Sequence, residues 1–102
     1  MQYQLVLQFS RASLASEDFF AALETELGEA LGDAAQIDGH DISARSINLF
    51  VLTADPASSF RRAKPVLQQR ELLEKVTAAH RLAGGARFTV LWPLRSLRKF
   101  KL

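Results

Sequence analysis

The sequence predicts an α+β domain in which two helices cover one face of an antiparallel sheet. Segments that alternate polar and apolar residues are separated by segments with helical periodicity, in the order strand, helix, strand, strand, helix, strand. The chain has 102 residues, enough for one modest hydrophobic core. We therefore expect one domain, residues 1–93, followed by a basic C-terminal tail, residues 94–102.

The first strand and the first helix are predicted by their periodicity. Residues 2–9 alternate between polar and apolar side chains, which is typical of a strand with one buried face. A helix is expected over residues 16–31. Ser16 can cap its first turn, where Glu17 and Asp18 place negative charge that the helix dipole favours. The expected core-facing stripe of this helix consists of Phe20, Leu23, Leu27 and Leu31.

Two further strands are predicted over residues 34–42 and 46–53. The first carries charged residues, which suit an edge of the sheet better than its centre. The second is apolar on both faces, which is typical of a central strand. We expect a short turn, Ser43-Ala44-Arg45, between them.

The second half of the chain is predicted to hold a kinked helical region and a last strand. The Asp-Pro pair at residues 55–56 is a typical helix start. Pro65 should interrupt the helix, because proline lacks a backbone donor and disfavours helical geometry in the residue before it. We therefore expect a short helix to Ala63, a longer one over residues 66–82, and a strand over residues 87–92.

This order of elements corresponds to two right-handed β-α-β crossovers within one antiparallel sheet. The expected fold is a ferredoxin-like βαββαβ sandwich with four strands in the order 4-1-3-2 and both helices on one face. That order places the first and third strands in the centre, in agreement with their apolar content.

The composition narrows the class of protein. The chain contains no cysteine, so a disulfide framework, thiolate chemistry and cysteine-based metal sites are excluded. The N-terminus lacks the basic leader of a signal peptide, and the apolar runs are too short to span a membrane. We expect a cytoplasmic protein without a membrane span, cofactor or metal.

The formal net charge of +2 conceals a strong asymmetry. Residues 1–51 carry two basic and eight acidic side chains, a net charge of −6, whereas residues 52–102 carry eleven basic and three acidic side chains, a net charge of +8. Such a split can steer a charged partner. It is equally expected if an acidic helix lies beside a basic one, which is the interpretation we favour.

Several short motifs stand out along the chain. They are Asp38-Gly39-His40-Asp41-Ile42, Ile47-Asn48-Leu49-Phe50-Val51, Asp55-Pro56, Lys64-Pro65-Val66-Leu67 and Thr89-Val90-Leu91-Trp92-Pro93. Together they resemble a family of small bacterial ferredoxin-like proteins that has no established function. The resemblance extends over most of the chain up to Pro93 and departs at Ser43-Ala44-Arg45, where relatives tend to have a glycine-containing turn. It implies no catalytic role for any residue.

The only cluster with acid–base potential consists of Asp38, His40 and Asp41. A carboxylate beside an imidazole can fix its tautomer and raise its basicity. Neighbouring strand residues point to opposite faces, so only Asp38 and His40 should be able to touch. His80 is the one other histidine, and no second cluster completes a triad or a metal site. We favour a structural role beside Gly39, in which the cluster satisfies backbone groups of a turn.

The sheet face away from the helices is the stronger candidate for a ligand or partner surface. The residues expected on it are Val6, Asn48, Phe50, Leu52 and Leu91. An exposed apolar patch of this kind usually marks an interface or a ligand groove, and pairing with a second copy would cover it. RNA-recognition domains instead stack bases on aromatic residues of this face. Only Phe50-Val51 matches their third-strand pattern.

The tail is basic and contains no acidic residue. Its charges are Arg95, Arg98, Lys99 and Lys101, interleaved with Leu94, Leu97 and Phe100. Such a segment can bind nucleic acid or an acidic partner. The alternative, which we favour, is that its apolar residues cover the seam between helices and sheet.

Taken together, these features predict a non-enzymatic interaction or accessory module that forms a homodimer through its sheet face. The alternative is a dimeric α+β-barrel-like small-molecule-binding protein or enzyme, with a pocket between sheet and helices and His40 or Asp38 at its mouth. A nucleic-acid binder that uses the basic tail is the third hypothesis.

Overall fold

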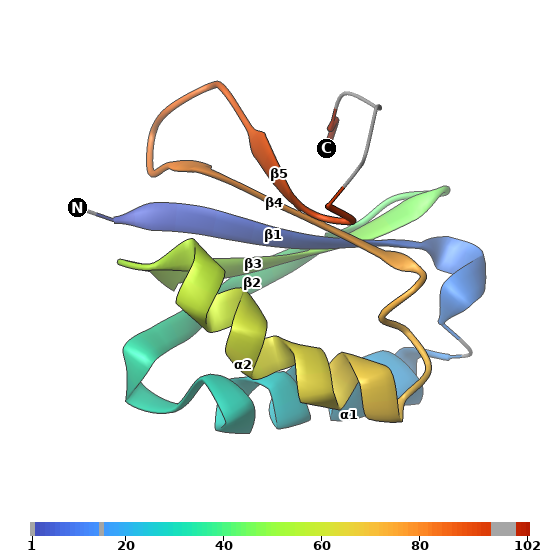
Figure 1. The fold of residues 1–102 in the computed structure, drawn as a ribbon. Coiled ribbons are helices and arrows are strands. Elements are labelled where there is room, and N and C mark those ends of the chain that lie inside the picture. The colour runs from blue at the N-terminus through green and yellow to red at the C-terminus, as the bar shows by residue number, and fades with distance from the viewer. Residues whose placement is uncertain (1, 15, 95–99) are drawn as a thin grey trace.

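The computed structural model describes residues 2–14, 16–94 and 100–102. The chain forms a five-stranded antiparallel sheet with both α-helices on one face, which confirms the predicted α+β class (Figure 1). The elements are β1 (Tyr3–Ser10), α1 (Glu17–Leu31), β2 (Ala35–Ile42), β3 (Ser46–Thr53), α2 (Pro56–Gln69), β4 (Val76–Leu82) and β5 (Thr89–Trp92), with 3-10 turns at Arg11–Ser13 and Gly32–Ala34. The strand order is β2-β3-β1-β4-β5. Neither α1 nor α2 is long and apolar enough to cross a membrane.

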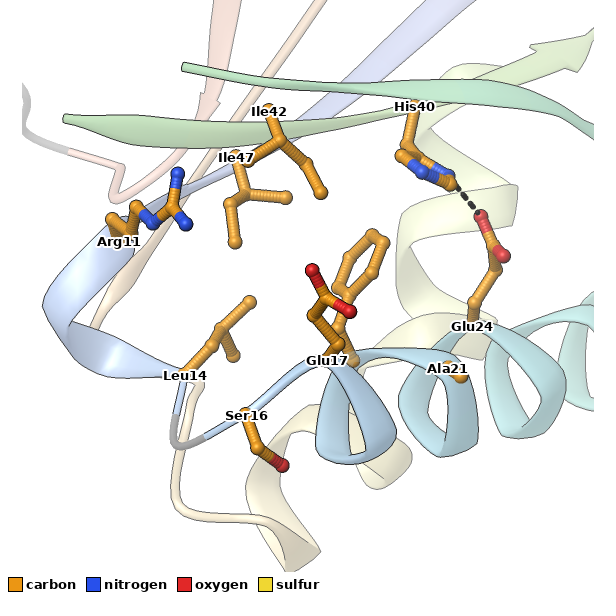
Figure 2. Close-up of a pocket in the computed structure, with 10 residues that line it drawn as sticks. Arg11, Leu14, Ser16, Glu17, Ala21, Glu24, His40, Ile42 and Ile47 are labelled. Carbon is orange, nitrogen blue, oxygen red and sulfur yellow. Dashed lines mark hydrogen bonds and ion pairs between the residues drawn. The ribbon is translucent and has the colours of Figure 1, made fainter. Parts of the chain in front are cut away.

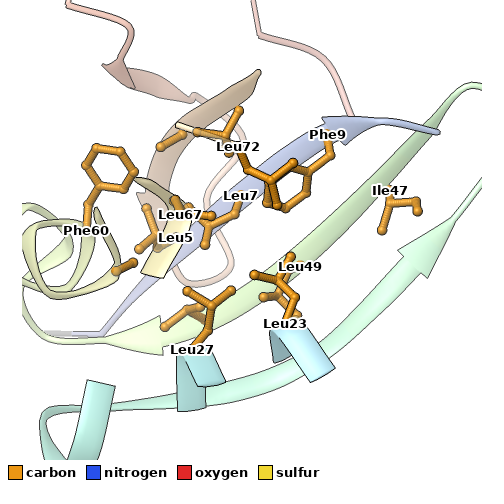
Figure 3. Close-up of a cluster of buried hydrophobic side chains, with 14 of the residues drawn as sticks. Leu5, Leu7, Phe9, Leu23, Leu27, Ile47, Leu49, Phe60, Leu67 and Leu72 are labelled. Atoms are coloured by element: carbon orange, nitrogen blue, oxygen red, sulfur yellow. The ribbon is translucent and has the colours of Figure 1, made fainter. Parts of the chain in front are cut away.

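The core lies between the sheet and the two helices (Figure 3). Leu5 and Leu7 of the central strand pair with Val51 and Leu49 of β3, and all four side chains are buried. On the other side of β1, Leu7 pairs with Ala78 of β4. Alternation along these strands therefore directs one continuous apolar layer toward the helices.

Helix α1 follows the sequence prediction closely. The Ser16 hydroxyl accepts a hydrogen bond from the backbone N–H of Phe19 at 3.1 Å, which caps the first turn. The buried residues of α1 are Phe20, Leu23, Leu27 and Leu31, the four that its periodicity predicts.

The prediction of a kinked helical region up to residue 82 is wrong. Helix α2 continues through Pro65, whose side chain is exposed, so the lost hydrogen bond lies on the solvent side of the helix. The helix ends where Glu71 adopts a φ of 59° and the N–H of Leu72 donates to the Leu67 carbonyl at 2.8 Å. This is the position and bonding that glycine usually provides at a helix end, so the sequence shows no obvious stop there.

The predicted sheet of four strands is also wrong in number. Residues 76–82, which were expected to be helical, form β4 and pair with β1. The strand expected over residues 87–92 is β5, which adds to β4 as a fifth strand at the edge. Trp92 anchors this edge, because its indole N–H donates to the Leu73 carbonyl at 2.8 Å and its ring lies 4.5 Å from the Lys64 ammonium.

The acidic and basic halves of the chain meet where α1 and α2 lie side by side (Figure 1). Arg70 donates two hydrogen bonds to the Glu26 carboxylate, from Nε at 2.8 Å and from Nη2 at 2.6 Å. These bonds hold the pKa of the Glu26 carboxyl below its ordinary value. Pairing of neighbouring helices thus accounts for part of the charge asymmetry.

Candidate functional site

A groove runs between α1 and the edge strand β2. It consists of two hollows of about 520 Å³ and 630 Å³, and both are lined by Glu24 and His40. We refer to it as the α1–β2 groove. Its two walls carry Glu17, Ala21, Glu24 and Gly28 from α1 and Ile37, His40 and Ile42 from β2.

The helical wall follows from residue spacing. Glu17, Ala21, Glu24 and Gly28 are separated by four, three and four positions, which aligns them in one stripe along α1. This stripe flanks the buried stripe of the same helix. Ala21 and Gly28 have little or no side chain, so the wall is low at these two positions. A Cβ on Gly28 would lie 3.7 Å from Ile37 Cδ1, which shows how closely the two walls approach there.

The strand wall follows from register. Ile37, His40 and Ile42 pair with Val51, Leu49 and Ile47 of β3, whose side chains are all buried in the core, so the β2 residues point toward the helix layer as well. A bulge at Asp38 and Gly39, where Gly39 has a φ of 99°, restores this orientation for His40.

His40 and Glu24 join the two walls (Figure 2). The imidazole Nδ1 lies 3.1 Å from Glu24 Oε2. A carboxylate only accepts hydrogen bonds at neutral pH, so Nδ1 is the donor to Glu24. The imidazole also makes an edge-to-face contact with the ring of Phe20, with 5.0 Å between the ring centres.

The structure separates His40 from the two aspartates of its sequence cluster. Asp38 and Asp41 are exposed, and neither has a hydrogen bond to His40 among the described residues. The bulge removes the simple alternation that would have placed Asp38 and His40 on one face. The carboxylate that contacts the imidazole is therefore Glu24, sixteen residues away on the helix.

One end of the groove is closed by Arg11. Its Nη1 donates to the Ser43 carbonyl at 3.0 Å and its backbone N–H donates to the Arg45 carbonyl at 2.9 Å, so the turn between β2 and β3 fixes it. The Glu17 carboxylate points into the hollow between Arg11 and His40 (Figure 2). Within residues 2–14, 16–94 and 100–102, Glu17 has no ion-pair partner.

The floor of the groove is apolar. Leu14, Phe20 and Ile47 are buried beneath it, whereas Ile42 remains 41 % exposed at its mouth. An apolar floor beneath a few charged groups is typical of ligand sites in proteins. The part of the chain that the structure describes holds no cluster of three or more histidine, aspartate or glutamate side chains that suits a metal ion.

The predicted surface on the opposite sheet face is only partly open. Val6 and Asn48 are 0 % and 1 % exposed, and Phe50 and Leu52 are half-buried. Leu91 is half-buried and packs against the core.

The C-terminal end of the chain lies on this same sheet face. Gln8 Nε2 donates to Asn48 Oδ1 at 2.9 Å and to the Lys101 carbonyl at 2.7 Å, and the rings of Phe88 and Phe100 are 4.8 Å apart. The sequence predicted that Phe100 covers the seam between helices and sheet. Phe100 instead lies on the opposite face of the sheet, so this prediction is wrong. Lys101 is exposed, and the other tail charges, Arg95, Arg98 and Lys99, lie outside the described residues.

The second histidine lies outside the α1–β2 groove. His80 on β4 contacts Tyr3 edge-to-face at 5.8 Å, and its Nδ1 is buried without a hydrogen-bond partner in the described chain. Burial lowers the pKa of His80 below its ordinary value, because the charged form loses hydration.

His40 is predicted from the sequence as a candidate site residue, whereas Arg11, Glu17 and Glu24 are not predicted as parts of the same site. The stripe on α1 was the available signal, since its acidic members lie at fixed helical spacing beside the core stripe. No protein-family model matches this chain, and no curated protein or solved structure matches it significantly. The resemblance of its motifs to a small bacterial family therefore stays a prediction.

Proposed function

We propose that this protein is a non-enzymatic binding module whose α1–β2 groove holds its ligand or partner. The observation that carries the proposal is the form of the groove: two neighbouring hollows that share Glu24 and His40, an apolar floor in the hollow toward Arg11, and charged groups at the rim. The groove lies between sheet and helices with His40 at its mouth, which is the place that the small-molecule-binding hypothesis requires.

A binding role fits the lining better than a catalytic one. The His40–Glu24 pair resembles the base and orienting acid of a catalytic dyad, but such a pair needs a nucleophile within reach. The hydroxyls that line the groove are those of Ser16 and Thr25, and both are engaged in α1: the Ser16 Oγ accepts the capping hydrogen bond, and the Thr25 Oγ1 donates to the Ala21 carbonyl at 3.1 Å. The pair therefore serves to hold the two walls together.

Ligand screening by NMR tests this proposal. We expect members of a small-molecule and peptide library to shift the backbone amide signals of both walls in ¹⁵N-labelled protein. Ala21→Trp should fill the groove and abolish these shifts. Ala22→Trp is the matched control, since Ala22 is exposed and points away from the stripe. Failure of every library member to shift these signals, or equal shifts in Ala21→Trp, would contradict the proposal.

A second candidate function is homodimerisation through the other sheet face. Phe50 and Leu52 are only half-buried there, and such apolar residues favour an interface. In a two-fold interface Phe50→Asp would bury an unpaired carboxylate at a cost of about 3 kcal/mol or more, so the dimer should dissociate. Light scattering measures this directly, and a wild-type monomer at high micromolar concentration would exclude it. Nucleic-acid binding by the tail remains a prediction.

A further inference from the structure

Within residues 2–14, 16–94 and 100–102, no strand pairs with the outer edge of β2. In the strand order β2-β3-β1-β4-β5, this strand pairs with β3 on one side only. Its residues from Asp38 to Ile42 are all exposed. The backbone N–H and C=O groups along this edge can accept a further strand, which is a common way for a domain to bind an extended peptide.

The α1–β2 groove extends along this whole edge. The β2 residues that line one hollow are Ala35, Gln36, Ile37, Gly39 and His40, and those that line the other are His40 and Ile42. An eight-residue strand is about 26 Å long at roughly 3.3 Å per residue. A site of this length, parallel to a free strand edge, suits an extended segment better than a compact small molecule.

Side chains on one face of an added strand would point toward the helix layer. Alternate side chains of a strand point to the same face and are about 6.6 Å apart. Those that face the helix layer would enter the hollows on either side of the His40–Glu24 pair. Phe20 and Ile42 offer an apolar contact there, and Glu17 offers a carboxylate that has no ion-pair partner in the part of the chain that the structure describes.

The charges around the edge select a basic partner. Asp38 and Asp41 lie on β2 itself and Glu17 and Glu24 lie on the facing wall, whereas Arg11 and the exposed Arg45 of the adjoining turn lie at one end. The site is built entirely from residues 1–51, whose net charge is −6. Charges and a bulge on an edge strand also protect it from pairing with other strands. The acidic side chains of β2 disfavour pairing with neutral or acidic strands, whereas they attract a strand that carries basic side chains.

We infer that the α1–β2 groove binds an extended peptide segment with alternating basic and apolar side chains, which adds to the free edge of β2. This inference rests on the proposed function and names the partner of that site.

Three synthetic octapeptides test the inference against the full chain. The first alternates lysine and valine, the second alternates glutamate and valine, and the third is the lysine–valine peptide with an N-methyl group on every second backbone nitrogen. We expect the first to shift the amide signals of β2 and of the α1 wall. The second should not bind. The third should bind about tenfold more weakly, because it cannot complete the backbone hydrogen bonds.

Two charge reversals provide a matched pair of variants. Glu17→Lys should weaken binding of the lysine–valine peptide by about tenfold, because it places a like charge in the hollow. Glu29→Lys changes the net charge equally, but Glu29 is exposed on another face of α1 and should leave the affinity within about twofold.

Three results would overturn the inference. The first is an equal loss of affinity for the lysine–valine peptide in Glu17→Lys and Glu29→Lys. The second is an N-methylated peptide that binds as tightly as the unmodified one. The third is the absence of binding at about 1 mM lysine–valine peptide. If library compounds occupy the groove but the lysine–valine peptide does not, the proposed function stands and the inference fails. If nothing occupies the groove, both fail.

Discussion

Replacing His40 with alanine tests whether this residue holds β2 against α1. The change removes the hydrogen bond from Nδ1 to the Glu24 carboxylate at 3.1 Å and the edge-to-face contact with Phe20 at 5.0 Å. The side chains of His40 and Glu24 are 41 % and 28 % exposed, so water screens the pair. Such a pair contributes at most about 1 kcal/mol, and the ring contact contributes about 0.5–1.5 kcal/mol.

The expected loss for His40→Ala is therefore about 1–2 kcal/mol in the free energy of unfolding. In a domain of this size a loss of 1 kcal/mol lowers the melting temperature by about 4–8 °C. His40→Gln keeps a hydrogen-bond donor but loses the ring, so it should cost about half as much.

Urea unfolding measures these differences, followed by circular dichroism and by the fluorescence of Trp92, the only tryptophan. Glu24→Gln alone and combined with His40→Ala completes a double-mutant cycle. The coupling energy of the two side chains should be about 0.5 kcal/mol. A distant effect of the histidine on the fold would give no coupling.

The structural account of His40 fails if both His40→Ala and His40→Gln unfold at the same urea concentration as the wild type. In that case the histidine contributes nothing to stability, and it becomes the first residue to examine for direct contact with a ligand in the α1–β2 groove.

Three further predictions concern other parts of the chain. Because burial lowers the pKa of His80 below 6.5, the unfolded chain binds a proton there more readily than the folded chain does. The free energy of unfolding should therefore fall as the pH drops below 6.5. The urea midpoint of His80→Gln should depend less on pH between 7.5 and 5 than that of the wild type. Arg70→Gln should let the pKa of Glu26 rise toward its ordinary value in an NMR titration, and an unchanged pKa would refute the assigned cause. Phe100→Ala should lower the melting temperature because its ring packs on another aromatic ring at 4.8 Å, whereas Leu102→Ala, at an exposed position, should not; equal melting of both would show that the tail does not stabilise the sheet.

Local signals in the sequence determined α1 and the first three strands. Ser16, the acidic first turn and four apolar residues at helical spacing lie within sixteen positions of one another, so the helix and its buried face follow from the segment itself. The apolar content of β3 and the charges of β2 likewise predicted a central and an edge strand, and the strand order confirms both positions.

The region after Pro65 shows where local signals are insufficient. A proline inside a helix costs about 3 kcal/mol, yet burial of Ala63 and Leu67 on either side keeps α2 continuous. The apolar residues of Val76–Leu82 fit helical and strand periods alike. Pairing with β1, whose residues lie 67 to 79 positions earlier in the chain, decides in favour of a strand.

The candidate site depended on tertiary structure to a greater degree than the helices and strands did. The sequence by itself identified His40 as a polar residue on an edge strand and Glu17 as part of the acidic first turn of α1. Only the tertiary structure brought them together, because the partner of His40 depends on the bulge in β2, the register of β2 on β3 and the position of α1 against the sheet. Periodicity and capping act between neighbours in sequence and can be read from it, whereas the contact between Glu24 and His40 is set by the packing of separate elements.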